Sequence, residues 1–243
     1  MRNWLYKFDI IRTLKDYLRP IKQAIFGKDG IYYVVSEIAT ARKDFPLKIV
    51  FDIGAAYGDT ARTFGKVFNE ATVYCFEPQP ESMARLERRT RHLKDRLKMF
   101  PLALLNRDGE AELNVLSYAD ASSFLPLQKY FKDQGIVEVG KISVPVVRLD
   151  DFVKEQNLAH IDFVKIDVEG VERELLEGGS ETFRDKVDNV FIEISPLRKG
   201  MHSGDYIEVF KFFHERGFTF MGCFGDYFFS KDVRLLRKYF GNI

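Results

Sequence analysis

The chain has 243 residues, of which 46% are hydrophobic and 30% are charged, a composition typical of one globular domain with at most an appendage and not of a disordered chain. Its 37 Lys and Arg residues nearly balance 36 Asp and Glu residues, for a formal charge of +1, so charge gives no reason to expect an obligatory nucleic-acid partner. Cys75 and Cys223 form no CxxC or Cys/His motif, which favours a reducing compartment over a zinc site and leaves open whether the two could pair.

Residues 1–30 are basic and amphipathic. They contain seven Lys or Arg and three Asp, and apolar side chains recur at helical spacing at Trp4, Phe8, Ile11, Leu14 and Leu18. The pattern predicts a helix that either binds a surface or a second copy of the chain, or packs on its own domain. We therefore assign residues 1–45 to an N-terminal helical extension. Charges interrupt any signal-peptide core, and no stretch approaches the ~20 apolar residues of a membrane span, so we expect a cytoplasmic protein without a transmembrane segment.

From residue 47 onward, short apolar runs alternate with helical patterns. Residues 47–53 (LKIVFDI) are typical of a strand covered on both faces. A helix with one apolar face is expected over 60–68, and a second strand over 72–76. Prolines then open a helix that runs to about residue 93, and a third strand is predicted at 98–104 (KMFPLAL).

The second half of the chain continues the alternation. The turn NRDG and the alternating residues 111–116 predict a hairpin, and the irregular segment 117–140 could form a lid over a substrate. Pro145 lacks an N–H group, so we expect the strand 142–149 at a sheet edge. The remaining predicted elements are strands at 161–166 and 187–194, helices at 171–176 and 206–214, and a closing hairpin of 218–224 and 227–230.

This order of elements predicts an α/β fold: a doubly wound, mostly parallel sheet with a C-terminal antiparallel hairpin. In such a sheet a ligand lies at the carboxyl ends of the strands, near the point where the strand order reverses. Polar residues at strand ends can therefore be sorted by the sheet edge that they occupy.

Asp52 and a glycine turn follow the first predicted strand. Gly54 and Gly58 allow positive φ angles and a close approach of the backbone to a ligand. The segment fails the dinucleotide fingerprint because Ala56 and Asp59 stand where its second and third glycines would be, and no Walker lysine follows. The turn therefore indicates an adenosine-type ligand without a pyrophosphate. Asp52 would hold a cationic amino group of that ligand, directly or through water.

Glu77 ends the second predicted strand. An acid at this place in a doubly wound sheet meets the ribose hydroxyls of a nucleoside ligand, and each charge-assisted hydrogen bond contributes about 1.5–3 kcal/mol. The alternative is that Glu77 only complements the dipole of the helix that follows. The preceding glycine turn favours the ribose.

Lys165 and Asp167 lie at the end of a predicted central strand, and Glu193 ends the next one. Lys165 and Asp167 are two residues apart in a strand, so they face the same side. Charges at the end of a central strand are costly unless they pair or bind a ligand. The alternative to a ligand site is a structural pair between Lys165 and a carboxylate, and Glu193 could partner either residue.

These segments together resemble the FkbM-type S-adenosylmethionine-dependent methyltransferases. The resemblance spans about residues 48–225 and rests on VFDIGAAYGDT at 50–60, FEP at 76–78, LDDF at 149–152, DFVKIDVEGVE at 162–172 and EISP at 193–196. It implies a class I, Rossmann-like sheet and methyl transfer, commonly to an oxygen of a sugar or polyketide-like small molecule. Residues 46–243 would form the methyltransferase domain, and the partner would be a small-molecule or glycan acceptor.

The resemblance also implies roles for single residues. S-adenosylmethionine would be held by Asp52, Gly54, Ala55, Gly58, Glu77, Pro78, Ala103, Leu104 and Asp167, with Ala103 and Leu104 beside the adenine. Ser122 and Ser123 match a serine-rich segment of the family, and we group them with Lys165 and Glu193 as candidate acceptor-binding residues.

A hydroxyl acceptor needs a group that takes its proton, while the sulfonium methyl group needs mainly alignment with the acceptor. Asp167 is the first candidate for a role near the reacting atoms. His202 follows the fifth parallel strand at the same edge and is either a second candidate base or a plain loop histidine. His160 precedes a strand and is expected at the opposite edge.

Two alternatives stay open. Asp167 and Glu193 could hold Mg²⁺, which prefers carboxylate oxygens, but no third ligand stands out, so we assign no metal site. The basic residues 85–96 could contact phosphate, which would fit an RNA methyltransferase or RNA-binding protein, whereas a solvated helix face explains the same pattern.

Overall fold

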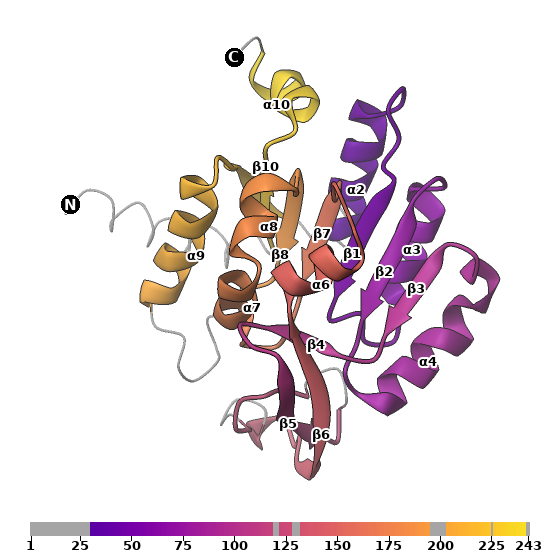
Figure 1. Cartoon of the computed structure of the whole chain (residues 1–243), viewed down its shortest axis with the longest axis vertical. Helices are drawn as coiled ribbons and strands as arrows, with labels where there is room; N and C mark the ends of the chain where they lie inside the picture. The colour runs from indigo at the N-terminus through magenta and orange to yellow at the C-terminus, as the bar shows by residue number, and fades with distance from the viewer. Residues whose placement is uncertain (1–29, 119–121, 128–131, 195–202, 225, 242–243) are drawn as a thin grey trace.

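The computed structural model describes residues 30–118, 122–127, 132–194, 203–224 and 226–241 (Figure 1). Its helices and strands in chain order are α2 (Gly30–Ala41), β1 (Ile49–Ile53), α3 (Asp59–Val67), β2 (Thr72–Phe76), α4 (Pro80–Thr90), the 3₁₀ helix η1 (Arg91–Leu93), β3 (Leu97–Phe100), β4 (Ala103–Leu105), β5 (Gly109–Leu116), β6 (Glu138–Arg148), α6 (Leu149–Glu155), β7 (Phe163–Ile166), α7 (Glu172–Gly178), α8 (Ser180–Asp185), β8 (Asn189–Ile192), α9 (Ser203–Glu215), β9 (Thr219–Phe224), β10 (Asp226–Ser230) and α10 (Val233–Phe240).

A seven-stranded sheet in the order β3-β2-β1-β7-β8-β10-β9 forms the centre of the molecule. β3, β2, β1, β7 and β8 pair in parallel, whereas β10 is antiparallel to both β8 and β9. The strand order reverses between β1 and β7, so their carboxyl ends are the expected place for a ligand. The predicted doubly wound, mostly parallel α/β fold with a C-terminal antiparallel hairpin is confirmed.

Helices cover both faces of this sheet (Figure 1). Successive side chains of β1 point to opposite faces and so pack into two different hydrophobic cores. Phe51 and Ile53 pack into a core with α6, α7, α8 and α9. Val50 packs into a second core with α2, α3, α4 and α10. Asp52 has the same parity as Val50 and is fully buried, so this strand brings a carboxylate into an otherwise apolar layer.

α2 is part of the second core, although it falls within the segment assigned to the N-terminal extension. Val34, Val35 and Ile38 are buried against the sheet and α3. The basic amphipathic helix predicted for residues 1–30 lies outside the described residues, apart from Gly30. Of the helices in the described part of the chain, none combines the length and the apolar character that a membrane crossing requires.

The strand predicted at 98–104 is wrong, because the chain divides it between two sheets. β3 ends at Phe100 and β4 begins at Ala103, with Pro101 between them. The N–H group of Leu102 donates to the carbonyl oxygen of Phe100 (2.9 Å). Proline has no N–H group for a ladder, so the chain leaves the large sheet here and enters a small one of order β4-β6-β5.

β6 is the central strand of the small sheet, so the expected edge position of the strand with Pro145 is wrong. The hairpin expected between 98–104 and 111–116 is also wrong, because β6 lies between β4 and β5. β5 pairs antiparallel with β6 and places Pro145 opposite Glu110. β4 pairs in parallel with β6 only from Val146 onward, opposite Ala103, so Pro145 lies just before the start of β4. A residue without an N–H group is tolerated there because β6 has a single neighbour at that point.

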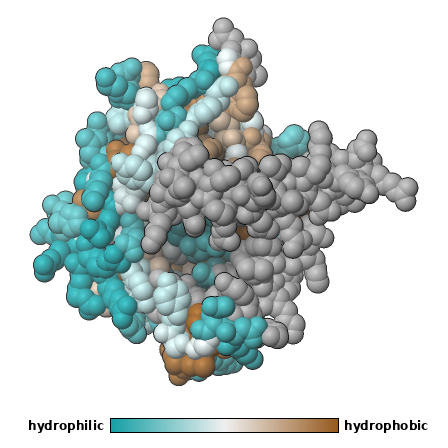
Figure 2. Space-filling view, turned by 180° about the vertical axis from the view of Figure 1, so that it is seen from behind, coloured by the Kyte–Doolittle hydropathy of each residue, from teal (hydrophilic) through white to brown (hydrophobic). Residues whose placement is uncertain are grey.

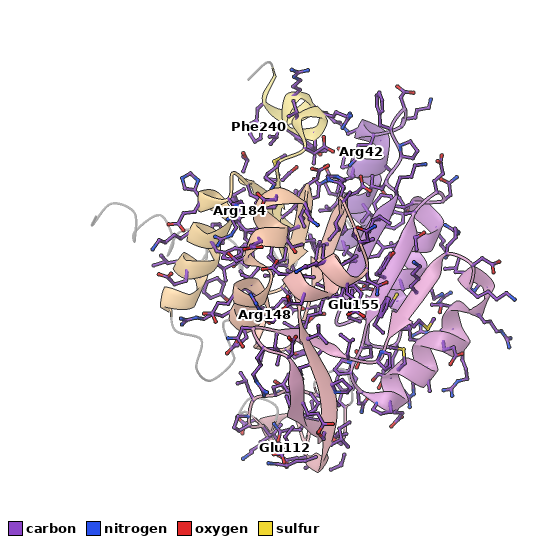
Figure 3. All side chains as sticks on the ribbon, viewed as in Figure 1. Arg42, Glu112, Arg148, Glu155, Arg184 and Phe240 are labelled. Carbon is purple, nitrogen blue, oxygen red and sulfur yellow. The ribbon has the colours of Figure 1, made fainter. Side chains whose placement is uncertain are left out.

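Arg42 ties four elements together at the amino edge of the large sheet. Its guanidinium group forms ion pairs with Asp162 (2.8 Å), Asp188 (3.3 Å) and Asp232 (3.5 Å). These acids precede β7, β8 and α10, and Asp232 caps α10. Figure 3 shows Arg42 at the end of the molecule opposite to Glu112 of the small sheet. His160 lies at this amino edge as expected, with its Nε2 atom 3.1 Å from Asp188.

The basic segment 85–96 lies on a hydrophilic side of the molecule, on the left in Figure 2. Several of its arginines are bound within the domain. Arg89 pairs with Asp59, Arg85 pairs with Glu81, and Arg96 donates to backbone carbonyl groups. These contacts favour a structural role over phosphate binding. Cys75 and Cys223 are both free thiols.

Candidate active site

A cavity of about 220 Å³ lies at the carboxyl edge of the large sheet, at the reversal point between β1 and β7. Its walls come from the turn after β1, the end of β2, the start of β4 and the end of β7. Leu113, Ser122 and Phe124, from β5 and the segment beyond it, line the cavity as well. Figure 1 shows the small sheet extending from this edge, so the two sheets enclose the site together.

The turn after β1 brings bare backbone to the cavity. Gly54 has φ +75°, and a Cβ atom there would lie 1.8 Å from the carbonyl oxygen of Asp167, so only glycine fits. The N–H groups of Gly54 and Ala55 both donate to the carbonyl oxygen of Phe76. Ala56 has φ +44°, a strained conformation of the kind that surrounding structure stabilises at functional sites.

Glu77 is held in place by the backbone of this turn. Its Oε2 atom accepts a hydrogen bond from the N–H group of Ala56 (2.9 Å), and its Oε1 atom accepts one from Gln79 (2.8 Å). Gln79 in turn caps α4 by accepting from the N–H group of Ser82. A carboxylate oxygen can accept more than one hydrogen bond. Glu77 lines the cavity, so its carboxylate is fixed by the turn at the cavity wall.

Lys165 connects the ends of β1 and β7 through a hydrogen bond and two ion pairs. Its Nζ atom donates to the carbonyl oxygen of Gly54 (2.6 Å) and lies 3.4 Å from Asp52 Oδ1 and 3.5 Å from Asp167 Oδ2. Asp52 is fully buried and does not contribute to the cavity wall, whereas Lys165 and Asp167 do. The ammonium group therefore stands between the buried Asp52 carboxylate and the cavity.

The buried charges shift one another's protonation. Burial raises the pKa of Asp52 to about 6, partly offset by the ammonium group of Lys165. Burial also acts to lower the pKa of Lys165, but the carboxylates of Asp167, Asp52 and Glu193 outweigh it and hold that pKa above its usual value. Lys165 is therefore charged at neutral pH and stabilises an ionised Asp52 behind the turn.

The loop after β7 is also strained at the cavity wall. Glu169 and Gly170 both have positive φ angles, +57° and +105°. The hydroxyl group of Ser123 donates to the carbonyl oxygen of Glu169 (2.6 Å) and accepts from the N–H group of Leu125. Ser123 therefore fixes this loop from behind, whereas Ser122 lines the cavity itself.

The cavity gathers many of the residues that the sequence singled out. Those that line it are Gly54, Ala55, Glu77, Pro78, Ala103, Leu104, Ser122, Lys165 and Asp167. Asp52, Gly58, Ser123 and Glu193 are not among the lining residues. Gly58 has φ +82° and lies against Leu86. His202 lies outside the described residues.

Other wall residues were not predicted. Tyr57 and Thr60 lie in the glycine-turn segment itself, so their place in that motif was an available signal. Leu113 and Phe124 reach the wall only because β5 and the segment beyond it fold over the site, and no local pattern marks them. Val171 follows β7 in the segment 162–172 that carries the resemblance, so that motif was an available signal.

The amino edge holds the one group of three potential metal ligands found in the described residues, namely His160, Asp162 and Asp188. Arg42 already pairs with both of these acids, and its positive charge opposes a metal cation there. This group lies at the opposite edge of the sheet from the cavity.

The sequence of this chain is similar to those of known methyltransferases. The model of the "Methyltransferase FkbM domain" family matches residues 52–220. The chain is 32% identical to the 2-O-methyltransferase NoeI of Sinorhizobium fredii over 184 residues, which are 72% of this chain and 75% of the relative. It is 24% identical to Methyltransferase 1 of Beauveria bassiana over 183 residues, 70% of this chain and 72% of the relative. Among solved structures, the METTL16 MTase domain aligns with a TM-score of 0.49 and 11% identity, covering 82% of this chain and 65% of that one.

Proposed function

Since the chain belongs to the FkbM methyltransferase domain family, we propose that its cavity binds S-adenosylmethionine and that the enzyme methylates a hydroxyl oxygen of a sugar, a glycan or another small molecule. The observation that carries the proposal is that a backbone turn which only glycine can form and a carboxylate fixed by that same turn lie on the wall of one cavity. The 2-O-methyltransferase among the relatives supports oxygen as the acceptor atom.

The cavity wall suits an adenosine-bearing cofactor. Glu77 would accept hydrogen bonds from the ribose hydroxyl groups, and Ala103 and Leu104 would border the adenine. Asp167 lines the cavity, and its Oδ1 atom is a buried oxygen with no hydrogen-bond partner among the described residues, with which a polar or cationic ligand group could pair. Gly54 leaves the backbone bare beside these side chains. When bound, the cofactor would supply a methyl group already activated by a positively charged sulfur.

The protein's own contribution would be alignment and proton transfer. Fixing the acceptor in line with the donor can contribute about 7–11 kcal/mol to the lowering of the barrier. Asp167 lies on the cavity wall and can accept the hydroxyl proton. Ser122 and Phe124 lie on the wall contributed from the small-sheet side, and we assign the acceptor to this side.

Ligand-induced thermal stabilisation tests cofactor binding. S-adenosylhomocysteine at about 100 times its Kd should stabilise the folded protein by about 2.7 kcal/mol, which raises Tm by about 5–10 °C for a chain of this size. Glu77→Ala should remove the shift, and the matched control Glu81→Ala, at an exposed position on α4, should keep it. An unchanged melting curve for the wild-type protein would contradict the proposal.

Methyl transfer itself is tested with isotope-labelled S-adenosylmethionine and a panel of sugars, glycans and cell extract. Mass spectrometry of the product should locate the label on an oxygen. Label recovered on RNA and on no small molecule would contradict the assigned acceptor class while leaving the methyltransferase activity in place.

A further inference from the structure

Three carboxyl groups form a row across adjacent strands at the carboxyl edge of the large sheet. Asp167 follows β7 and Glu193 follows β8, and the N–H group of Glu193 donates to the carbonyl oxygen of Ile166 (2.9 Å), which continues the parallel pairing up to these acids. β10 runs antiparallel beside β8 in a register that puts Asp226 opposite Glu193. Side chains alternate along strands, so all three acids lie on the face that carries Lys165.

This row has more negative than positive charge. The groups that act on Glu193 are Asp167 and Lys165 from the β7 end, Asp226 from β10 and Glu172 from α7. The Asp167 carboxylate, burial and Asp226 together raise the pKa of Glu193 to about 8, and Lys165 only partly opposes them. Glu193 therefore holds a proton at neutral pH.

Asp167 connects this row to the cavity. It lines the cavity wall, its Oδ2 atom lies 3.5 Å from Lys165 Nζ, and its Oδ1 atom has no hydrogen-bond partner in the described part of the chain. Glu193 is not on the wall and is half-buried, so it would act on a ligand through Asp167. The Asp167 carboxylate is the first cause of the raised pKa of Glu193, so the proton on Glu193 depends on the charge beside Asp167.

Building on the proposed function, we propose that Asp167 and Glu193 act as one proton-holding pair, which releases a proton when the cationic methyl donor binds and takes up the acceptor's hydroxyl proton when the methyl group is transferred. A cation nearby favours the ionised form of a carboxyl group, so donor binding prepares the pair to accept a proton. In the transfer, the acceptor oxygen loses its proton and gains the methyl group. The electron pair of the broken carbon–sulfur bond stays on sulfur. The positive charge disappears at that moment, so the proton affinity of the pair rises as the proton arrives.

Proton release on binding distinguishes this pair from a merely structural one. Calorimetric titrations at pH 7, in two buffers of different ionisation enthalpy, measure how many protons the protein releases when a ligand binds. The two ligands are S-adenosylmethionine and S-adenosylhomocysteine, whose sulfur is uncharged, and no acceptor is present. The wild-type protein should release roughly half a proton or more per S-adenosylmethionine in excess of the release with S-adenosylhomocysteine. Equal release with the two ligands would overturn the inference.

Variants assign the proton to Glu193. Glu193→Gln should still bind S-adenosylmethionine, with the excess release lost, whereas Glu155→Gln, an exposed glutamate at the end of α6 (Figure 3), should release as the wild type does. Asp226→Asn tests the pair while leaving Asp167 and Glu193 unchanged. Loss of the negative charge of Asp226 lowers the pKa of Glu193, so fewer excess protons should be released. Unchanged release in Glu193→Gln or in Asp226→Asn would overturn the inference. Absence of any binding heat from either ligand in the wild-type protein would instead contradict the proposed function, on which the inference rests.

Discussion

The ammonium group of Lys165 donates a hydrogen bond to the carbonyl oxygen of Gly54 at 2.6 Å, across 111 positions of the chain. The same nitrogen lies 3.4 Å from the Asp52 carboxylate. One side chain thus fixes the backbone turn that lines the cavity and neutralises the acid buried behind it. Lys165 therefore links the stability of the sheet to the shape of the site.

Lys165→Met should be strongly destabilising. It leaves the Asp52 carboxylate buried without a cation, and removing one partner of a buried ion pair costs about 3–5 kcal/mol. Urea unfolding monitored by circular dichroism measures the change. Lys66→Met, at an exposed position on α3, should stay within about 0.5 kcal/mol of the wild type. Adding Asp52→Asn to Lys165→Met should recover part of the loss, and a Lys165→Met variant as stable as the wild type would show that the pair is not needed.

Gly54→Ala should lower stability by about 3 kcal/mol or more and abolish binding of S-adenosylhomocysteine. The added Cβ atom meets the backbone carbonyl of Asp167, and the positive φ angle is strained for alanine. Thermal melting with and without the ligand measures both effects. Gly140→Ala is the matched control, because a Cβ atom there meets nothing within 4 Å. Ligand binding by a folded Gly54→Ala protein would contradict the role of this turn.

Ser123→Ala should lower the free energy of unfolding by about 0.5–1.5 kcal/mol. It should also weaken ligand binding, because the loop on the cavity wall loses the hydrogen bond that fixes it. Its hydroxyl group holds the carbonyl oxygen of Glu169, in the strained loop on the cavity wall. Calorimetric titration with S-adenosylhomocysteine gives the affinity. Ser143→Ala, which removes an exposed hydrogen bond to Glu110, should leave affinity unchanged. Equal affinity in both variants would mean that the loop keeps its shape without Ser123.

Stability should fall as pH rises through the pKa of His160. The hydrogen bond to Asp188 and the negative charges of Asp188 and Asp162 raise that pKa above 6.5, although burial and Arg42 oppose the shift. A histidine that binds protons more tightly in the folded state stabilises it fully below about pH 6.5 and loses this contribution as pH increases through the folded-state pKa.

Urea unfolding between pH 5.5 and 8.5 measures this slope. His160→Gln should flatten it, whereas His92→Gln, at an exposed position on the 3₁₀ helix η1, should not. A slope that is the same in the wild type and in His160→Gln would assign the pH dependence to other groups.

Local sequence patterns determined the order of the elements and part of the site. Apolar runs and helical spacing depend on neighbouring residues, so the alternation from β1 to β8 and the closing hairpin could be predicted. Gly54 and Glu77 could be located because a parallel sheet brings strand ends to one edge, and both residues follow predicted strands. The short helices α6 and α8, of 7 and 6 residues, were not predicted because so short a helix carries little periodicity of its own. α10 was not predicted either, although its apolar residues lie on one face.

The tertiary structure decided which of these residues face one another. Pro101 diverts the chain into a second sheet, and the expected edge strand with Pro145 becomes the centre of that sheet. Asp52 turns towards Lys165 and away from the cavity wall, and Asp226 joins Asp167 and Glu193 only because β10 inserts antiparallel beside β8. Strand order and register set such contacts between residues far apart in the chain, and one residue of register moves every side chain to the other face. Sequence patterns are local, so they give each strand its two faces, whereas the assembled sheet decides which charges share a face.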